Sequence, residues 1–382
     1  MTGKTETCMH SVEQMKAQRW NALADDRCAL GGVSVFTQVF IGMALYLYTH
    51  VSTPGYLSIL LTVPFALLLL LLAFCTAKNA DSETGVIAFA VGKRLEKPVL
   101  FVFLLLHLFN AQLVFMSLCA ILMEAMPEHS LWKLAMLTAL ALSWANSGRK
   151  EDTLARLARF LKWVVFVLFL YAVVTAFPHG SAANFFPLLG YGWKSIGNGA
   201  VWMCGAVSGC IWPLMRPQKK LSLSPILEQK SRIVLPTLLA ILAGCAVMLV
   251  SVWLMPVYAM SRSETLGWRL LLMINMTPSI PAWSMETVGV LLLFFLALSN
   301  SVNEASALLK SMAGKESASA WITLLLLLIL LPCAVFQFDA VLDTLSAIAS
   351  FRGPATLFFM LLLYGGSLLH RKRTVTGKET AT

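Results

Sequence analysis

Long apolar runs separated by short charged connections constrain this chain more than any other feature of its sequence. Residues 56–77 form one such run, which no charged side chain interrupts. Because the core of a bilayer about 30 Å thick takes roughly 20 residues of α-helix, these runs predict membrane-spanning helices. Hydrophobic residues make up 58% of the chain and charged residues 13%, whereas about a quarter of the residues in soluble proteins are charged. The sequence therefore predicts an all-α transmembrane protein.

The boundaries of the apolar runs predict ten spans. They cover residues 29–49, 56–77, 98–123, 131–147, 157–177, 196–215, 233–256, 285–308, 318–337 and 349–369. The fourth has the shortest apolar stretch, and by hydropathy alone an interfacial helix is the alternative there. The count of ten predicts three parts: a cytoplasmic N-terminal segment over 1–28, a ten-span domain over 29–373 and a cytoplasmic tail over 374–382.

Basic residues in the connections support this count independently. The 29 Lys and Arg residues divide unevenly: the two chain ends and every second connection together hold 24, and the remaining connections hold 5. An excess of positive charge marks cytoplasmic loops. Deleting the fourth span would merge loops of opposite character and remove the alternation. We therefore expect a multi-pass membrane protein with both termini in the cytoplasm. Its net charge of +10 belongs to these loops and gives no reason to expect nucleic acid as a partner.

Ten spans divide into two halves of five, and five is an odd number. The second half then enters the membrane from the opposite face, which is the 5+5 inverted repeat of many secondary transporters. In such folds the first helix of each half is broken near the middle of the membrane. Small residues concentrate in the first and sixth spans of this chain, so we expect these two helices to be discontinuous.

The two small-residue helices supply most of the candidate ligand-binding residues. Unwound backbone offers N–H and C=O groups to a ligand where lipid would leave them unsatisfied. The alternative is close helix packing, for which the spacing of Gly205 and Gly209 is typical. The candidates in these helices are Thr37, Gln38 and Gly42 in the first span, and Cys204, Gly205, Ser208 and Gly209 in the sixth.

Polar residues within the third and eighth spans complete the predicted site. His107 is the deeply placed ionisable residue of the third span, and Asn110 shares its helix face. Both are ligand-binding candidates, although an interhelical hydrogen bond is an equally simple role for a buried histidine. In the eighth span Asn300, Asn303 and Glu304 fall on one face. Asn300 is the candidate there, and a solvated inner helix end is the alternative.

Motifs of soluble enzymes are missing from the sequence. It holds no GxxxxGK[ST], GxSxG or HExxH pattern, and its eight cysteines form neither a CxxC pair nor a cluster with histidine. We therefore expect no enzymatic activity, no cofactor and no metal site. Membrane lipid and a small ligand are the partners that the apolar runs and the polar candidates predict.

Several short motifs carry a resemblance to a known family. They are Ala90–Lys93 before the third span, Leu154–Ala158 before the fifth, Asn184–Gly192, the sixth span closing at Pro213, the basic loop Arg216–Lys220, and the end at Arg371–Arg373. In this order, over about residues 30–373, the chain resembles the spore germination permease family, the B subunits of GerA-type nutrient germinant receptors.

The resemblance implies a LeuT-like fold of the amino acid, polyamine and organocation transporter superfamily, in the inner membrane of a spore. It implies A-type and C-type receptor subunits as partners and a small nutrient such as an amino acid as ligand. Our hypothesis, from the candidate residues above, places this ligand between the first, third, sixth and eighth helices. One departure is Gly42-Met43-Ala44, where the family tends to have Gly-x-Gly. The alternatives are an amino acid permease that works by alternating access and a membrane scaffold that transports nothing.

Overall fold

The computed structural model describes most of the predicted spans, and all of its elements are helices. Predicted spans 131–147 and 318–337 lie outside the described residues, and 157–177 is described only in part. The described residues are 3–80, 85–125, 154, 156–160, 163, 167, 170, 171, 174, 177–215, 224–254, 265, 266, 269, 270, 273, 285–313 and 338–379.

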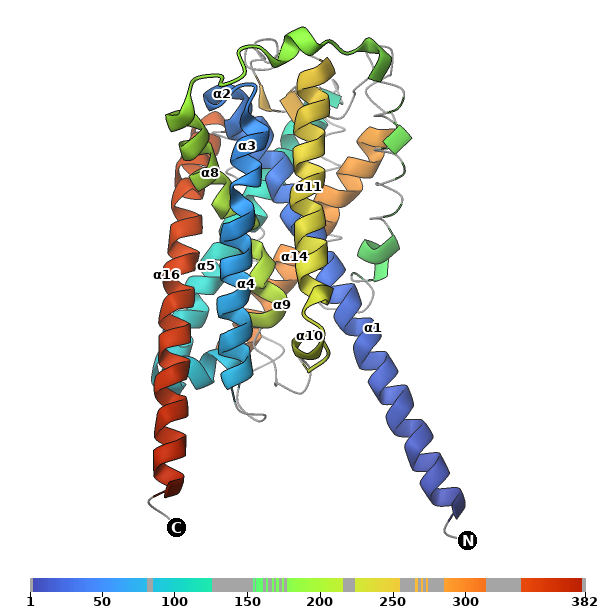
Figure 1. The fold of residues 1–382 in the computed structure, drawn as a ribbon, viewed down its shortest axis with the longest axis vertical. Coiled ribbons are helices and arrows are strands. Elements are labelled where there is room, and N and C mark those ends of the chain that lie inside the picture. The colour runs from blue at the N-terminus through green and yellow to red at the C-terminus, as the bar shows by residue number, and fades with distance from the viewer. Residues whose placement is uncertain are drawn as a thin grey trace.

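Six helices in this part of the chain are long and apolar enough to cross a membrane, and they bundle side by side (Figure 1). They coincide with the predicted first, second, third, seventh, eighth and tenth spans, so the chain is a multi-pass membrane protein. The candidate spans are Ala24–His50, Gly55–Asn79, Val86–Glu124, Ser231–Leu254, Val288–Met312 and Asp343–Arg371.

These spans belong to helices that extend beyond them at several ends. The long helices are α1 (Gly3–Gly42), α4 (Thr62–Asn79), α5 (Val86–Ala125), α11 (Ser231–Leu254), α14 (Met285–Ala313) and α16 (Phe338–Glu379). Shorter elements connect or continue them. They are α2 (Tyr48–His50), α3 (Gly55–Leu60), α10 (Ser224–Glu228) and the 3-10 turns η2 (Phe177–His179) and η3 (Ala182–Phe185).

The first span changes its helix type but does not unwind. After α1 ends at Gly42, a π-helical turn, η1 (Met43–Leu47), leads directly into α2. Gly42 itself has α-helical angles of −61° and −35°. The expectation of an unwound first helix is therefore wrong for these residues. The π turn has an outside partner, because Nη1 of Arg269 donates a hydrogen bond of 3.0 Å to the carbonyl oxygen of Ala44.

The sixth span is interrupted, also by a change of helix type. Helix α8 (Trp193–Val207) passes into the 3-10 turn η4 (Ser208–Ile211) and then into the short helix α9 (Trp212–Met215). Pro213 explains the change, because it lacks the N–H that an α-helix would donate to Gly209. Instead the N–H of Trp212 donates to the Gly209 carbonyl. Both the first and the sixth α-helices are thus interrupted by a change of helix type, and neither is unwound there.

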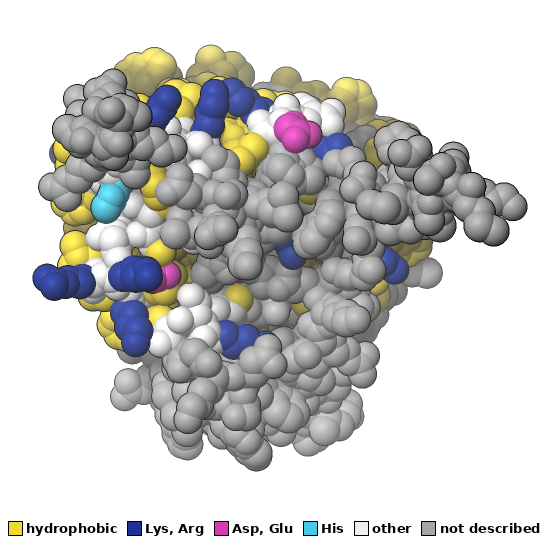
Figure 2. Space-filling model, turned by 90° about the horizontal axis from the view of Figure 1, so that it is seen from below, with side chains coloured by type: hydrophobic (Ala, Val, Ile, Leu, Met, Phe, Trp, Pro, Cys, Tyr) yellow, Lys and Arg dark blue, Asp and Glu magenta, His cyan; other side chains and the backbone are white. Residues whose placement is uncertain are grey.

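Basic side chains gather at one end of the bundle. Both termini lie at one end, which we call the terminal face, and residues 177–192 run across the other (Figure 1). Figure 2 shows the terminal face, where Lys and Arg side chains gather; Lys78, Lys93 and Arg94 are among the exposed ones. At the opposite end the hydroxyl of Ser58 donates to the Ile196 carbonyl at 2.9 Å. The basic residues between the second and third spans therefore lie at the terminal face, where α4 ends and α5 begins.

Candidate ligand pocket between four helices

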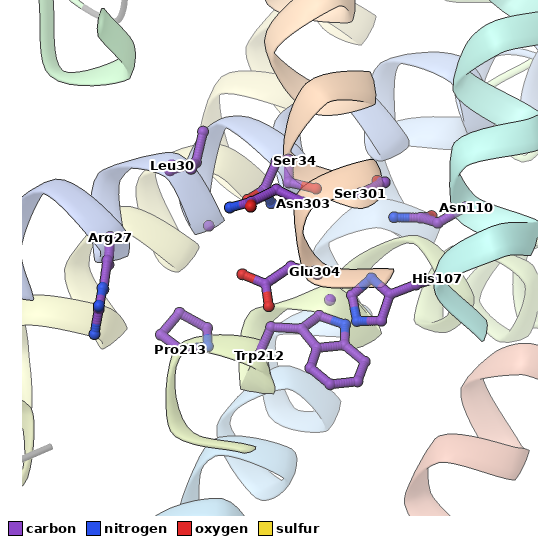
Figure 3. Close-up of a pocket in the computed structure, with 13 residues that line it drawn as sticks. Arg27, Leu30, Ser34, His107, Asn110, Trp212, Pro213, Ser301, Asn303 and Glu304 are labelled. Carbon is purple, nitrogen blue, oxygen red and sulfur yellow. The ribbon is translucent and has the colours of Figure 1, made fainter. Parts of the chain in front are cut away.

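A pocket opens between four helices that are far apart in the sequence (Figure 3). Its walls come from residues 27–34 of α1, 107–110 of α5, 209–213 of η4 and α9, and 300–304 of α14. These elements belong to the first, third, sixth and eighth predicted spans. The structure thus brings together the four helices from which the sequence predicted a ligand site.

The pocket lies in the half of the bundle nearer the terminal face. Residues 27–34 fall early in the span Ala24–His50, which enters from that face, and residues 300–304 fall late in Val288–Met312. Its free space has room for about two water molecules. In this structure the pocket is therefore nearly closed, and a larger ligand requires the helices to separate.

Neutral amides dominate the buried part of the wall. Asn110 is 3% exposed, Asn300 is 8% and Asn303 is 6%, and all three line the pocket. An amide side chain both donates and accepts hydrogen bonds, so it suits a polar solute of either kind. Asn303 belongs to the helix face that the sequence analysis left open between a pocket and a solvated helix end. Its burial and its place in the wall favour the pocket.

Ionisable groups line the pocket beside these amides. Arg27 and Glu304 belong to its wall, and Figure 3 shows the Glu304 carboxylate between Pro213 and the side chains of α14. His107 is 2% exposed, and its ring centroid lies 3.6 Å from that of Trp212. Among the described residues no three His, Cys, Asp or Glu side chains group as metal ligands. The wall therefore offers two opposite charges, an imidazole and amides.

Four of the ten candidate ligand residues line the pocket: His107, Asn110, Gly209 and Asn300. Thr37 and Gln38 are buried in α1, just beyond the pocket residues of that helix. The Thr37 hydroxyl donates to its own helix, to the Val33 carbonyl at 2.9 Å.

The other four candidates serve helix contacts. A Cβ atom on Gly42 would lie 2.5 Å from Cζ3 of Trp202, so this glycine lets α1 approach α8. Gly205 and Cys204 lie against α16, where a Cβ on Gly205 would be 2.5 Å from the Ala349 carbonyl oxygen. The Ser208 hydroxyl donates to the Gly205 carbonyl at 2.7 Å. For Gly205 the packing alternative is therefore the one that the structure supports.

Arg352 of α16 is a buried cation that the sequence analysis did not select. The count of basic residues assigned it to the outer connection before the tenth span, but it is 5% exposed inside the bundle. Its Nη1 donates to Oδ1 of Asn110 and, at 3.5 Å, to Oε1 of Gln38. The available signal was a single arginine within an apolar run, next to Gly353 and Pro354.

An ion-pair cluster lies next to the pocket on the side of the terminal face. Nε of Arg159 is 2.8 Å from Oδ1 of Asp26, and Nη1 of Arg232 is 3.3 Å from Oδ1 of Asp25. The side chains of Arg159 and Asp25 are 45% and 44% exposed, so solvent screens much of this attraction. The cluster joins the start of the first span to residues 156–160 and to α11.

Comparisons with known proteins bear on the fold. No family model matches the chain, and no curated protein matches it by sequence. A solved nucleobase-cation-symport-1 family transporter, in a closed conformation with bromovinylhydantoin bound, aligns over 94% of this chain and 93% of its own, with a TM-score of 0.57 and 12% identity. A manganese transporter of Eremococcus coleocola, in complex with an aromatic bis-isothiourea substituted compound, aligns over 92% and 95%, with a TM-score of 0.40 and 12% identity. The first similarity shows that this chain has the fold of a LeuT-type membrane transporter.

Proposed function

We propose that this chain is a permease that carries a small polar solute across a membrane by alternating access. The observation that carries the proposal is the polar, nearly closed pocket between the first, third, sixth and eighth spans. A discontinuous helix beside a central pocket is the arrangement that transporters of this kind use to hold a solute. The proposed process has no chemical step, so we assign no catalytic residue.

The proposal includes a topology of ten spans in a 5+5 inverted repeat, with the terminal face in the cytoplasm. The support is the basic character of that face (Figure 2), because Lys and Arg in short connections mark the cytoplasmic side of a membrane protein. In this orientation the pocket lies nearer the cytoplasm. The ion-pair cluster of Asp25, Asp26, Arg159 and Arg232 then lies at the cytoplasmic ends of helices that must separate for release.

Uptake by the purified full chain in proteoliposomes tests this function. We expect saturable entry of at least one solute from a panel of labelled amino acids and nucleobases, with a rate above that of protein-free liposomes. Counterflow, in which unlabelled solute inside accelerates entry of label, distinguishes alternating access from a leak. If none of these solutes enters above the protein-free background, the permease proposal fails.

Gly209 allows a graded test of the pocket within this assay. Among the described residues, a Cβ atom there would meet only Nη2 of Arg352, at 4.0 Å, which is ordinary van der Waals contact. Gly209→Ala should therefore leave uptake within about twofold of the wild type, whereas the larger side chain of Gly209→Leu should lower it by about tenfold or more. Both variants should reach the membrane at normal level. Equal uptake by the wild type and Gly209→Leu would remove this turn from the solute path.

The sequence resemblance favours a second candidate function, the membrane subunit of a nutrient germinant receptor. In this case an amino acid or similar nutrient in the pocket would favour one of two states of the bundle and trigger germination. The partners would be A-type and C-type receptor subunits in a spore inner membrane. Co-purification of this chain with such subunits from spores, and loss of nutrient response in Gly209→Leu spores, would support a receptor. Recovery of this chain from spore membranes without them would count against it.

A further inference from the structure

We infer that the ligand of this pocket carries a carboxylate group and that Arg352 binds that carboxylate. This inference rests on the proposed function, because it names the class of solute that the same pocket takes. Three features carry it: a buried guanidinium that has no counter-ion among the described residues, hydrogen-bond donors beside it that no described residue uses, and a glycine in the wall that separates it from the pocket.

Arg352 is the first feature, since a cation at this depth calls for an anion. The side chain is 5% exposed, and within the described part of the chain it forms no ion pair, only bonds to the amide oxygens of Asn110 and Gln38. A buried charge is costly unless it is paired as well as hydrogen-bonded. Two neutral oxygens solvate the guanidinium but do not neutralise it, so a ligand that brings a negative charge gains affinity there.

Unused donors beside these bonds are the second feature. Among the described residues only Nη1 of Arg352 has an acceptor, which leaves Nε and Nη2 without one. These two nitrogens form the side of the guanidinium that binds both oxygens of a carboxylate at once. Nε2 of Gln38 is buried and lacks an acceptor as well. The group therefore offers donors and needs acceptors, which a carboxylate supplies and an ammonium or a metal cation does not.

The thin wall between Arg352 and the pocket is the third feature. Gly209 lines the pocket, and a Cβ atom on it would lie 4.0 Å from Nη2 of Arg352. Asn110 also lines the pocket and is at the same time an acceptor for Nη1. A carboxylate that enters along Gly209 thus approaches the free nitrogens, and its charge makes it a stronger acceptor than the amide of Asn110.

Matched probe pairs test the inference on the purified full chain in detergent. The probes are propionate, L-alanine and L-leucine, each compared with its amide, and sodium chloride at equal ionic strength. We expect at least one of the three carboxylates to raise the unfolding temperature in a saturable way, while its amide and chloride do not. Arg352→Gln should raise the Kd of that carboxylate by about tenfold or more. The Kd of Arg352→Lys should lie between those of the wild type and Arg352→Gln, because lysine keeps the positive charge but lacks the paired N–H donors of a guanidinium.

Arg371→Gln is the control variant, because it removes an exposed cation from the same helix and should leave the Kd unchanged. Arg352→Gln should unfold at the wild-type temperature or above it, since it removes a buried charge, and the Arg352→Lys comparison stands even if Arg352→Gln does not fold. Three results would overturn the inference. They are an equal response to the amides or to chloride, an unchanged Kd in the Arg352 variants, and no response to any carboxylate. Uptake of a nucleobase without a carboxylate response would overturn it and leave the permease standing. A carboxylate response without uptake of any solute would support the carboxylate inference and overturn the permease proposal.

Discussion

Gly205→Ala is expected to destabilise the bundle and to lower the amount of protein in the membrane. Helix α8 packs closely against α16, and a Cβ atom on Gly205 would lie 2.5 Å from the backbone oxygen of Ala349. A backbone atom cannot rotate away as a flexible side chain does, so the two helices must move apart. Forcing one extra methyl group into such a contact costs about 1–3 kcal/mol of the free energy of unfolding. Thermal unfolding of the purified protein and its membrane yield measure the effect.

Gly197→Ala is the matched control for this variant. Gly197 belongs to the same helix, and a Cβ atom there would meet no described residue within 4 Å. Alanine in place of glycine within a helix is favourable by up to about 1 kcal/mol when space allows. Gly197→Ala should therefore unfold at the same temperature as the wild type or higher. If Gly205→Ala were as stable as Gly197→Ala, the close approach of α8 to α16 would be wrong.

Trp202→Ala should have a larger effect on stability. The indole is 2% exposed and contacts three parts of the bundle. It lies against Gly42, its ring stacks on Tyr46 of the π turn with centroids 5.7 Å apart, and its Nε1 donates to the Ser346 carbonyl at 3.0 Å. Removing a buried tryptophan leaves a cavity and loses the hydrogen bond of its Nε1, which together cost about 3–5 kcal/mol. Thermal unfolding of the detergent-solubilised variant measures the loss.

Trp193→Ala provides the comparison within the same helix. Trp193 is 69% exposed, so its replacement by alanine should change the unfolding temperature of the protein little. The difference between the two variants then isolates the contacts of Trp202 from any general effect of losing an indole. A Trp202→Ala protein that unfolds together with Trp193→Ala would show that α8 does not fasten the first span to α16.

Hydropathy predicted the six described spans well because the bilayer imposes one requirement on all of them. Every crossing needs a helix of roughly 20 apolar residues, and this leaves a simple pattern in the sequence. Residues 56–77 and 233–256 illustrate this: their predicted limits agree with Gly55–Asn79 and Ser231–Leu254 to within a few residues. Small residues likewise located the interruption of the sixth helix. They do not specify the form of an interruption, which at Ser208–Ile211 follows from Pro213.

The candidate site was predicted less completely, for reasons that particular residues make clear. His107, Asn110, Gly209 and Asn300, which line the pocket, were selected because polar or small residues are rare inside apolar runs. Gly42 and Gly205 share that signal but lie against other helices, and the partner of a glycine depends on long-range packing that one sequence does not display. Arg352 was missed because it follows the start of an apolar run closely. From sequence alone such a residue is indistinguishable from a loop cation.

The common position of the two chain ends also bears on how many times the chain crosses the membrane. The start of α1 and the end of α16 project from the same face (Figure 1). A chain that leaves a bilayer on the side where it entered has crossed it an even number of times. An even number of spans is therefore expected, and the ten spans inferred from loop charge meet that condition. Fusing a reporter to each end in turn should accordingly place both reporters in one compartment.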